Sequence, residues 1–371
     1  MQQIAKKLLK NSKKQQIFKF KYIYYAFINE NNNKRINMND MKKIGLTALA
    51  GSLVAISAQA AEMTVSGATM LTYTSADGTE VTGNPFGMKT NLAFTASGEV
   101  NGYNVSYMQT SADQFAGMSS ARLSVDMGDM GTIAFDQGSG SGLATIDDKT
   151  PTAAEEIWDG LDTATGANAQ GLVGAAGNTG VFNYINTFGG VTFNGAARKG
   201  SGSANSDGAS SGAGQSAWDF ALTTDGSMLG VDGLAIGLGY GEAENGSEAS
   251  TTYGDTVHMT AFANYSVGPV TFGYQEAYIE ANKNGTDDEH TKAWGLAFNV
   301  NENLSISYGE RDVVFKGAGA SADVTEKGDG IAVAYTMGSM KIAGNRNSVS
   351  DNDGTAGSND EMTEIAVSFA F

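Results

Sequence analysis

The sequence predicts an all-β protein, a transmembrane antiparallel β-barrel of about sixteen strands. Three observations predict it. After residue 62, apolar and polar side chains alternate with a period of two, which is typical of strands with one apolar face. Short Gly- and Asn-rich turns alternate with long polar loops, an asymmetry typical of membrane barrels. The chain ends in Phe371, with Phe369, Val367 and Ile365 at alternate positions, which predicts a last strand with a wholly apolar outer face.

The composition excludes several other classes of protein. The 371 residues include 23 Lys and Arg, 40 Asp and Glu, 49 Gly, 3 Pro and no Cys. Without Cys there is no disulfide scaffold and no thiolate metal site. The formal net charge of −17 argues against nucleic acid as a partner, because phosphate binding needs clustered bases. The glycines follow no three-residue period, so the chain is not collagen-like.

The first sixty residues differ in charge from the rest. Residues 1–43 hold eleven bases and two acids, whereas 62–371 hold twelve bases and thirty-eight acids. We interpret 41–60 as a secretory signal peptide, because Lys42 and Lys43 precede a short apolar run that ends at the cleavage pattern Ala58-Gln59-Ala60. The run is too short and too polar for a transmembrane helix. Residues 1–40 are then an upstream extension or a start-site artefact, and 61–371 is the barrel domain.

Each predicted strand is a stretch of alternating apolar and polar residues that ends at a turn or a loop. Tight turns follow several of them, for example at 128–131, 189–190 and 338–339. Two all-β alternatives fit less well: an adhesin solenoid needs a fixed repeat, and a β-sandwich rarely uses this many residues in one domain. The sixteen expected strands lie near 62–74, 88–98, 102–112, 119–128, 131–138, 180–188, 191–199, 216–224, 233–242, 256–267, 269–280, 291–300, 303–316, 328–337, 339–347 and 360–371.

Several of these segments resemble a known family. The hairpin 123–135 with its tight turn at 127–132, the strand segments at 182–184 and 188–193, the signal peptide and the terminal Phe371 are together similar to general diffusion porins of Gram-negative bacteria. The resemblance implies a homotrimer of sixteen-stranded barrels in the lipid of the cell outer membrane, each a water-filled channel for passive diffusion of small hydrophilic solutes and ions. It also implies that the third extracellular loop folds into the lumen, and the spacing places that loop at 139–179.

The charges near this loop are the candidate functional residues. If the loop folds inward its carboxylates line the narrowest point and favour cations modestly; the plainer interpretation is an ordinary solvated outer loop. Lys and Arg residues at strand positions that alternate toward the lumen form the expected basic wall. A basic side chain that faces lipid at mid-depth would cost about 2–4 kcal/mol. The acids are Asp147, Asp148, Glu155, Glu156, Asp159 and Asp162, and the bases are Lys89, Arg122, Arg198, Arg311 and Lys341.

Two other functions fit the sequence less well than a channel does. An enzyme in a barrel usually needs a His near a Ser or an Asp, and the chain has only His258 and His290, neither in a catalytic motif. The loop fragments at 284–289 and 351–354 do not fit a calcium-binding pattern. We therefore expect no enzymatic activity, no cofactor and no metal site. A structural or adhesive barrel with little conductance would share the strands and the signal peptide, and conductance distinguishes it from a porin.

Overall fold

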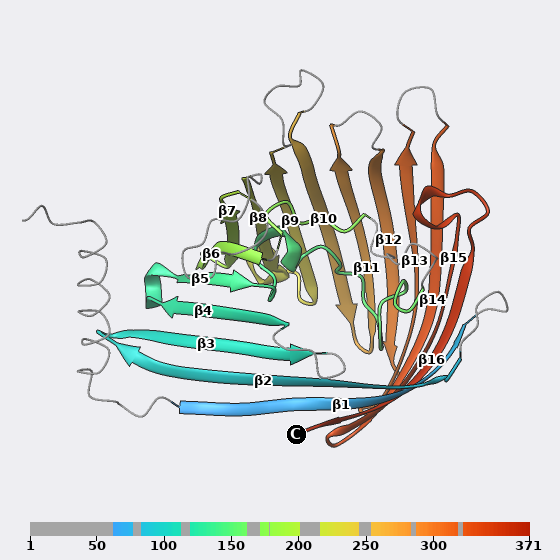
Figure 1. The fold of residues 1–371 in the computed structure, drawn as a ribbon, viewed down its shortest axis with the longest axis horizontal. Coiled ribbons are helices and arrows are strands. Elements are labelled where there is room, and N and C mark those ends of the chain that lie inside the picture. The colour runs from blue at the N-terminus through green and yellow to red at the C-terminus, as the bar shows by residue number, and fades with distance from the viewer. Residues whose placement is uncertain are drawn as a thin grey trace, which may run out of the picture. The chain divides into compact units, whose positions relative to one another are not determined.

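The computed structural model describes residues 62–76, 83–112, 119–161, 171–177, 179–200, 216–244, 254–282, 287–317 and 322–371. The predicted signal peptide, the upstream segment 1–40 and Asp162 lie outside these residues. Within them, sixteen antiparallel strands form one closed barrel in which each strand pairs with its neighbours in sequence and β1 pairs with β16 (Figure 1). The strands are β1 (Glu62–Ala76), β2 (Phe86–Val100), β3 (Tyr103–Ala112), β4 (Ser120–Asp126), β5 (Thr132–Gln137), β6 (Thr179–Phe188), β7 (Val191–Arg198), β8 (Ala217–Asp225), β9 (Leu234–Ala243), β10 (Thr256–Val267), β11 (Val270–Glu280), β12 (Asp288–Asn299), β13 (Leu304–Lys316), β14 (Val324–Met337), β15 (Met340–Ser350) and β16 (Asp360–Ala370).

The predicted fold class is confirmed, and each predicted strand overlaps one observed strand. The largest difference is at β14, which begins at Val324 rather than at 328. The extra residues include Lys327, whose charge made this end look like a loop. In a barrel wall that extends beyond the hydrocarbon, however, charged residues can occupy strand positions.

The barrel closes where its first strand, β1, pairs with its last strand, β16. The backbone N–H of Gly67 donates to the carbonyl of Phe371 at 2.9 Å, and the N–H of Phe371 donates to the carbonyl of Gly67 at the same distance. Closure leaves no strand edge unpaired, which a lipid environment requires because it offers backbone groups no partners.

The alternation gives the barrel an apolar outside and a small or polar inside. On β4, for example, Leu123 faces outward with 47% of its surface exposed, while Arg122 and Ser124 face the lumen. Tyr265, Tyr335 and Phe371 are also exposed on the outside, as their parity predicts. A wide barrel of this kind buries no conventional core between its strands.

One end of the barrel carries short turns and the other carries long loops. The turn between β2 and β3 is Asn101-Gly102, with φ of 54° and 89°, which is the left-handed geometry of a two-residue hairpin turn. The longest connection at the opposite end joins β5 to β6 across 138–178, and we call it the inner loop. It contains a short 3-10 helix, Gly142–Thr145. No helix in the described ranges is long and apolar enough to cross a bilayer.

Candidate functional site

The inner loop is fixed to the inside of the barrel wall by Asp219 of β8. Its neighbour Trp218 is 44% exposed on the outside, so the alternation points Asp219 inward, where it is 2% exposed. One carboxylate oxygen accepts the backbone N–H of Leu143 at 3.0 Å, and the other accepts that of Ala176 at 2.7 Å. A single carboxylate therefore holds the first and the last part of the loop together.

Two amide side chains hold the middle of the loop. The Nε2 of Gln275 on β11 donates to the carbonyls of Ile146 at 2.8 Å and Asp147 at 3.0 Å, and its Oε1 accepts the N–H of Lys149 at 2.6 Å. The Nδ2 of Asn264 on β10 donates to the carbonyl of Lys149 at 2.6 Å. These side chains bind the loop backbone, so they fix its path without using its charged side chains.

The contacts between the loop and the inner wall continue around the barrel to β13 and β15. The hydroxyl of Ser307 on β13 accepts the N–H of Ala153 at 2.8 Å. On β15, the Nδ2 of Asn347 donates to the carbonyls of Glu156 at 3.0 Å and Asp159 at 2.9 Å. The loop thus crosses the inner face from β8 to β15, which confirms the predicted inward fold (Figure 1).

Apolar packing adds to these hydrogen bonds. Leu143, Ile146 and Val173 of the loop form a buried cluster with Ala221 and Ala277 of the wall. Phe262 of β10 packs against this cluster. Its side chain is on the lumen side of the wall and partly buried, and its contact with the loop explains why an aromatic residue stands there.

Strand glycines leave room for the loop. A Cβ at Gly273 of β11 would lie 2.4 Å from the Cδ of Pro151, and one at Gly295 of β12 would lie 2.7 Å from the Pro151 carbonyl oxygen. Glycine within a strand commonly marks such a close approach of another segment. The loop and the wall are therefore complementary in shape as well as in hydrogen bonding.

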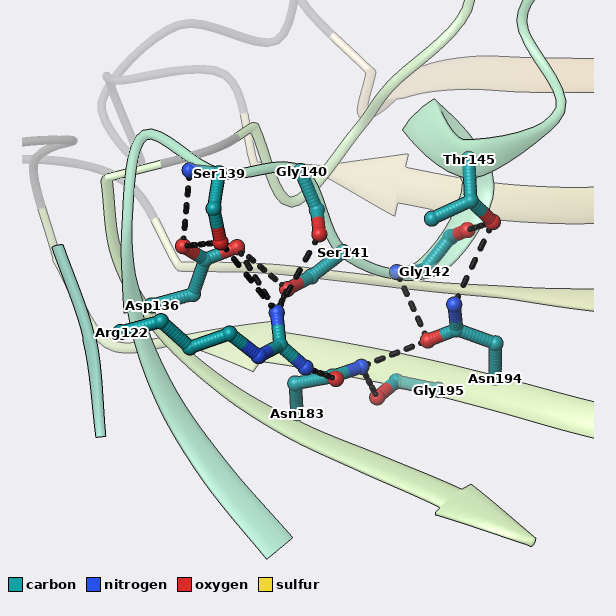
Figure 2. A network of polar contacts seen from close by, with 10 residues as sticks. All are labelled: Arg122, Asp136, Ser139, Gly140, Ser141, Gly142, Thr145, Asn183, Asn194 and Gly195. Carbon is teal, nitrogen blue, oxygen red and sulfur yellow. Dashed lines mark hydrogen bonds and ion pairs between the residues drawn. The ribbon is translucent and has the colours of Figure 1, made fainter. Parts of the chain in front are cut away.

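The base of the loop is a polar network around Arg122, shown in Figure 2. The guanidinium of Arg122 on β4 lies 3.3 Å from the buried carboxylate of Asp136 on β5. It also donates to the carbonyl of Gly140 at 3.3 Å, to the hydroxyl of Ser141 at 3.1 Å and to the amide oxygen of Asn183 on β6. Ser141 in turn donates to Asp136 at 2.6 Å. The loop therefore leaves β5 in a direction fixed by charge-assisted hydrogen bonds.

Five of the six predicted acids lie on the segment 147–159, which follows the anchored base, and Asp162 lies outside the described residues. Asp147, Asp148, Glu155 and Glu156 are half-buried and Asp159 is exposed. Burial, together with the adjacent Asp148 carboxylate, raises the pKa of Asp147 to about 7. Burial, with help from neighbouring carboxylates, also raises the pKa of Glu156 to about 7. Although Asp159 is in contact with water, partial desolvation by the surrounding protein raises its pKa, as does Glu155, and Lys89 lowers it. The acids are thus close enough to act on one another.

The predicted basic wall separates into two groups. Lys89 of β2 is exposed on the lumen side and its charge acts on Asp159, while Lys341 of β15 lies near the short-turn end, beside Thr336 in register. Arg122 binds the base of the loop, as described above. Arg198, at the end of β7, lies next to Gly177 near the end of the loop. The arginines thus lie against the loop, and Lys89 acts through its charge on Asp159 of the loop.

Arg311 of β13 is the clearest departure from the expected arrangement. It is only 3% exposed, because its guanidinium lies under the ring of Trp158, 4.9 Å from the ring centroid. Its Nη1 is 3.2 Å from the Oε1 of Glu326 on β14. Arg311 therefore holds the loop from beneath through a cation–π contact, and does not line open water.

Other residues in the site were not predicted. Asp219, Gln275 and Asn347 have lumen parity, which the sequence could reveal, but their loop partners could not be read from it. Glu364 of β16 is a further wall carboxylate: it faces the lumen, accepts the hydroxyl of Thr74 at 3.2 Å, and interacts with Lys89 and Asp159. The acids of the loop thus face an additional acid on the wall.

The two histidines lie in different places. The Nδ1 of His258 on β10 accepts the N–H of Gly174 at 3.3 Å, so this side chain is another anchor of the inner loop. His290 of β12 faces outward and stacks on Tyr278 at a centroid distance of 4.1 Å. Within the described ranges, no three His, Asp or Glu residues are grouped so that they could hold a metal ion.

Comparisons with known proteins identify the fold. No protein-family model matches the sequence, and no curated protein matches it. Among solved structures, a loop-deletion mutant of OmpT, an outer membrane protein of Vibrio cholerae, aligns with a TM-score of 0.61 at 14% identity, over 84% of this chain and 100% of that one. A porin gives a TM-score of 0.58 at 14% identity, over 84% and 100% of the two chains. The outer membrane channel DcaP of Acinetobacter baumannii gives 0.58 at 12% identity, over 85% and 99%. The chain therefore has the fold of outer-membrane porins and channels.

Proposed function

We propose that the protein is a porin of the Gram-negative outer membrane, a water-filled channel through which small hydrophilic solutes and ions diffuse passively. The observation that carries the proposal is the inner loop, which is fixed across the inside of a sixteen-stranded barrel. A barrel of this size is too wide for its own side chains to fill, so an open lumen narrowed by one loop is the expected arrangement for a channel.

We also propose a modest preference for cations. Five acids, Asp147, Asp148, Glu155, Glu156 and Asp159, share the loop segment with one base, Lys149. Arg122 and Arg311 are engaged with other groups at the base of the loop and beneath it. Carboxylates at a constriction lower the electrostatic cost for cations to leave bulk water, and at physiological ionic strength only charges within about 8 Å act strongly. The local excess of acid therefore decides the preference.

The family resemblance suggests the state of assembly. We propose a homotrimer because the family that the sequence resembles is trimeric, and we expect an oligomer that resists detergent until it is heated. Electrophoresis of unheated and heated samples tests this. A protein that migrates as a monomer before heating contradicts it.

Planar-bilayer recording of the purified protein tests the channel itself. Stepwise conductance above leak supports it, and a barrel that inserts without steps favours a structural or adhesive role. In a salt gradient, the triple variant Glu155→Gln, Glu156→Gln, Asp159→Asn should shift the zero-current potential toward that of an anion-preferring pore. An unchanged potential would mean that these side chains do not line the conduction path.

A further inference from the structure

Six residues that face the lumen on six neighbouring strands lie opposite one another and form one row across the inner wall. The four central ones are glycines of β11, β12, β13 and β14, and strand register places each glycine directly opposite the next. An asparagine lies opposite the outermost glycine at each end. We call these six residues the docking row: Asn264, Gly273, Gly295, Gly309, Gly330 and Asn347.

The segment 147–159 of the inner loop follows this row from β10 to β15. At the β10 end, the side chain of Asn264 donates to the carbonyl of Lys149 at 2.6 Å. Pro151 then lies over the first two glycines, and Ile157 lies over the last two. At the β15 end, the asparagine donates to two further carbonyls of the segment. Hydrogen bonds thus fix both ends of the segment, and the glycines face the part between them.

Glycine lets the loop lie closer to the wall here than any residue with a side chain would. A Cβ at Gly295 would lie 2.7 Å from the carbonyl oxygen of Pro151, and one at Gly309 would lie 3.2 Å from the Cγ2 of Ile157. A Cβ at either of the two outer glycines would also approach one of these two loop residues. Because carbon atoms in contact are normally about 3.5–4.0 Å apart, side chains along the row would hold the loop about 1 Å farther into the lumen.

The strand backbone itself does not require these glycines. None of the four has a positive φ, so any residue could adopt their conformation. Glycine also weakens a strand interior, because it loses more conformational freedom on folding than other residues do. What the glycines supply is therefore space for the loop. The next row toward the short turns, by contrast, carries a side chain on each of the same four strands: Thr271, Ala297, Ser307 and Ala332.

We propose that the glycines of the docking row set the size limit of the channel, because they fix the distance between the inner loop and the wall. This inference rests on the proposed porin function. Space that the loop loses to the wall must be taken from the open lumen, so a bulkier row makes a narrower passage. The loop covers the glycines, so they are positioning residues that act on a permeating solute through Pro151 and Ile157.

The four positions differ in what a new side chain would meet. A Cβ at either outer glycine would also collide with the amide oxygen of the neighbouring asparagine, and would thus disturb the hydrogen bonds that fix the segment. The two inner glycines avoid this complication. Gly295 faces a backbone oxygen of the loop, which cannot rotate away, whereas Gly309 faces a side-chain methyl group. Gly295→Ala should therefore displace the loop more than Gly309→Ala does.

The experiment measures the size limit with neutral solutes, so that ion selectivity does not affect the result. Wild type, Gly295→Ala, Gly309→Ala and the matched control Gly328→Ala are reconstituted in liposomes and tested for swelling in sugars that range from a pentose to a tetrasaccharide. A Cβ at Gly328, on the lumen side of β14, would meet nothing closer than 3.6 Å. Each rate is divided by the rate for the pentose, which removes differences in the amount of protein inserted. The size limit should shift toward smaller sugars most in Gly295→Ala, less in Gly309→Ala, and not in the control.

A second change tests the contact with Ile157 directly. Ile157→Ala removes the Cγ2 that a Cβ at Gly309 would meet, and it leaves Pro151 as it is. The Cβ would also lie 3.0 Å from the carbonyl oxygen of Trp294, but that contact is within the wall and does not involve the loop. In the Ile157→Ala background, Gly309→Ala should therefore no longer shift the size limit, whereas Gly295→Ala should shift it as before. Such non-additivity between two changes identifies a direct contact.

The results that would overturn the proposal are specific. One is an unchanged size limit in Gly295→Ala when heat-modifiable mobility shows that the barrel is folded. Another is an equal shift in Gly328→Ala, because the space under the loop would then not be the cause. Should Gly295→Ala not fold, Gly309→Ala with and without Ile157→Ala carries the same test, and an equal shift in both backgrounds overturns the proposal. Wild-type liposomes that swell in no sugar would instead contradict the channel function, so the two failures are distinguishable.

Discussion

The base of the inner loop and its acidic segment are built in opposite ways. At the base, the charged groups of Arg122, Asp136 and Asp219 bind one another or the loop backbone, and Leu143 and Val173 are buried. In the segment 147–159, wall amides and a hydroxyl bind the backbone, and the carboxylates are left for the lumen. One part of the loop thus sets the shape of the constriction, and the other sets its charge. Changes in the two parts should therefore have separable effects.

The largest effect is expected from Asp219→Ala. The change leaves two buried backbone N–H groups without acceptors, each at a cost of about 1–3 kcal/mol, so the inner loop should detach. Single-channel recording should show a larger and noisier conductance, and the folded barrel should lose stability to heat or denaturant. Asp225→Ala, at an exposed turn that ends the same strand, is the control. Equal conductance for both variants would contradict the role of Asp219 as an anchor.

The next effect comes from filling the space that the loop occupies. Gly273→Ala would place a Cβ 2.4 Å from Pro151 and should cost about 1–3 kcal/mol, or displace the loop into the lumen and reduce conductance. Gly328→Ala is the matched control, since its Cβ would meet nothing closer than 3.6 Å. If both variants conduct and unfold like wild type, the loop does not pack on β11 as described.

The acidic segment of the inner loop should make ion selectivity depend on pH. Asp147 and Glu156 have pKa values raised to about 7, so they are mostly charged at pH 8 and mostly protonated at pH 5. Protonation removes negative charge, and cation preference should therefore fall between pH 8 and pH 5. The variant Asp147→Asn, Glu156→Gln should lose most of this dependence. A dependence that survives in the variant would assign the titration to other groups.

The smallest effect is expected at Lys89. This lysine acts on Asp159, so Lys89→Gln should increase cation preference slightly. Lys341→Gln, a change of the same charge nearer the short turns, should have less effect on the zero-current potential. The reverse order would place the constriction at the other end of the pore.

The strands could be predicted from the sequence because their signal is local. Alternation needs only neighbouring residues, and it placed all sixteen strands and the parity of Lys89, Arg122 and Arg311. The partners of these residues could not be predicted, because they come from distant parts of the chain: Arg311 meets Trp158, and Asp219 meets both Leu143 and Ala176. A basic side chain that points into the lumen can contact either water or a loop, and its position in the alternation does not distinguish the two.

The pairing of Gly67 with Phe371 has a consequence for the order of folding. Every other strand pair joins neighbours in sequence, and such pairs form at a small entropic cost, whereas β1 and β16 must bring the two ends of the barrel domain together. Non-local contacts of this kind are slow to form. Until this last seam closes, β1 and β16 are both open edges that can pair with other chains. The final residues of the chain thus decide whether a nearly complete sheet becomes a barrel or aggregates.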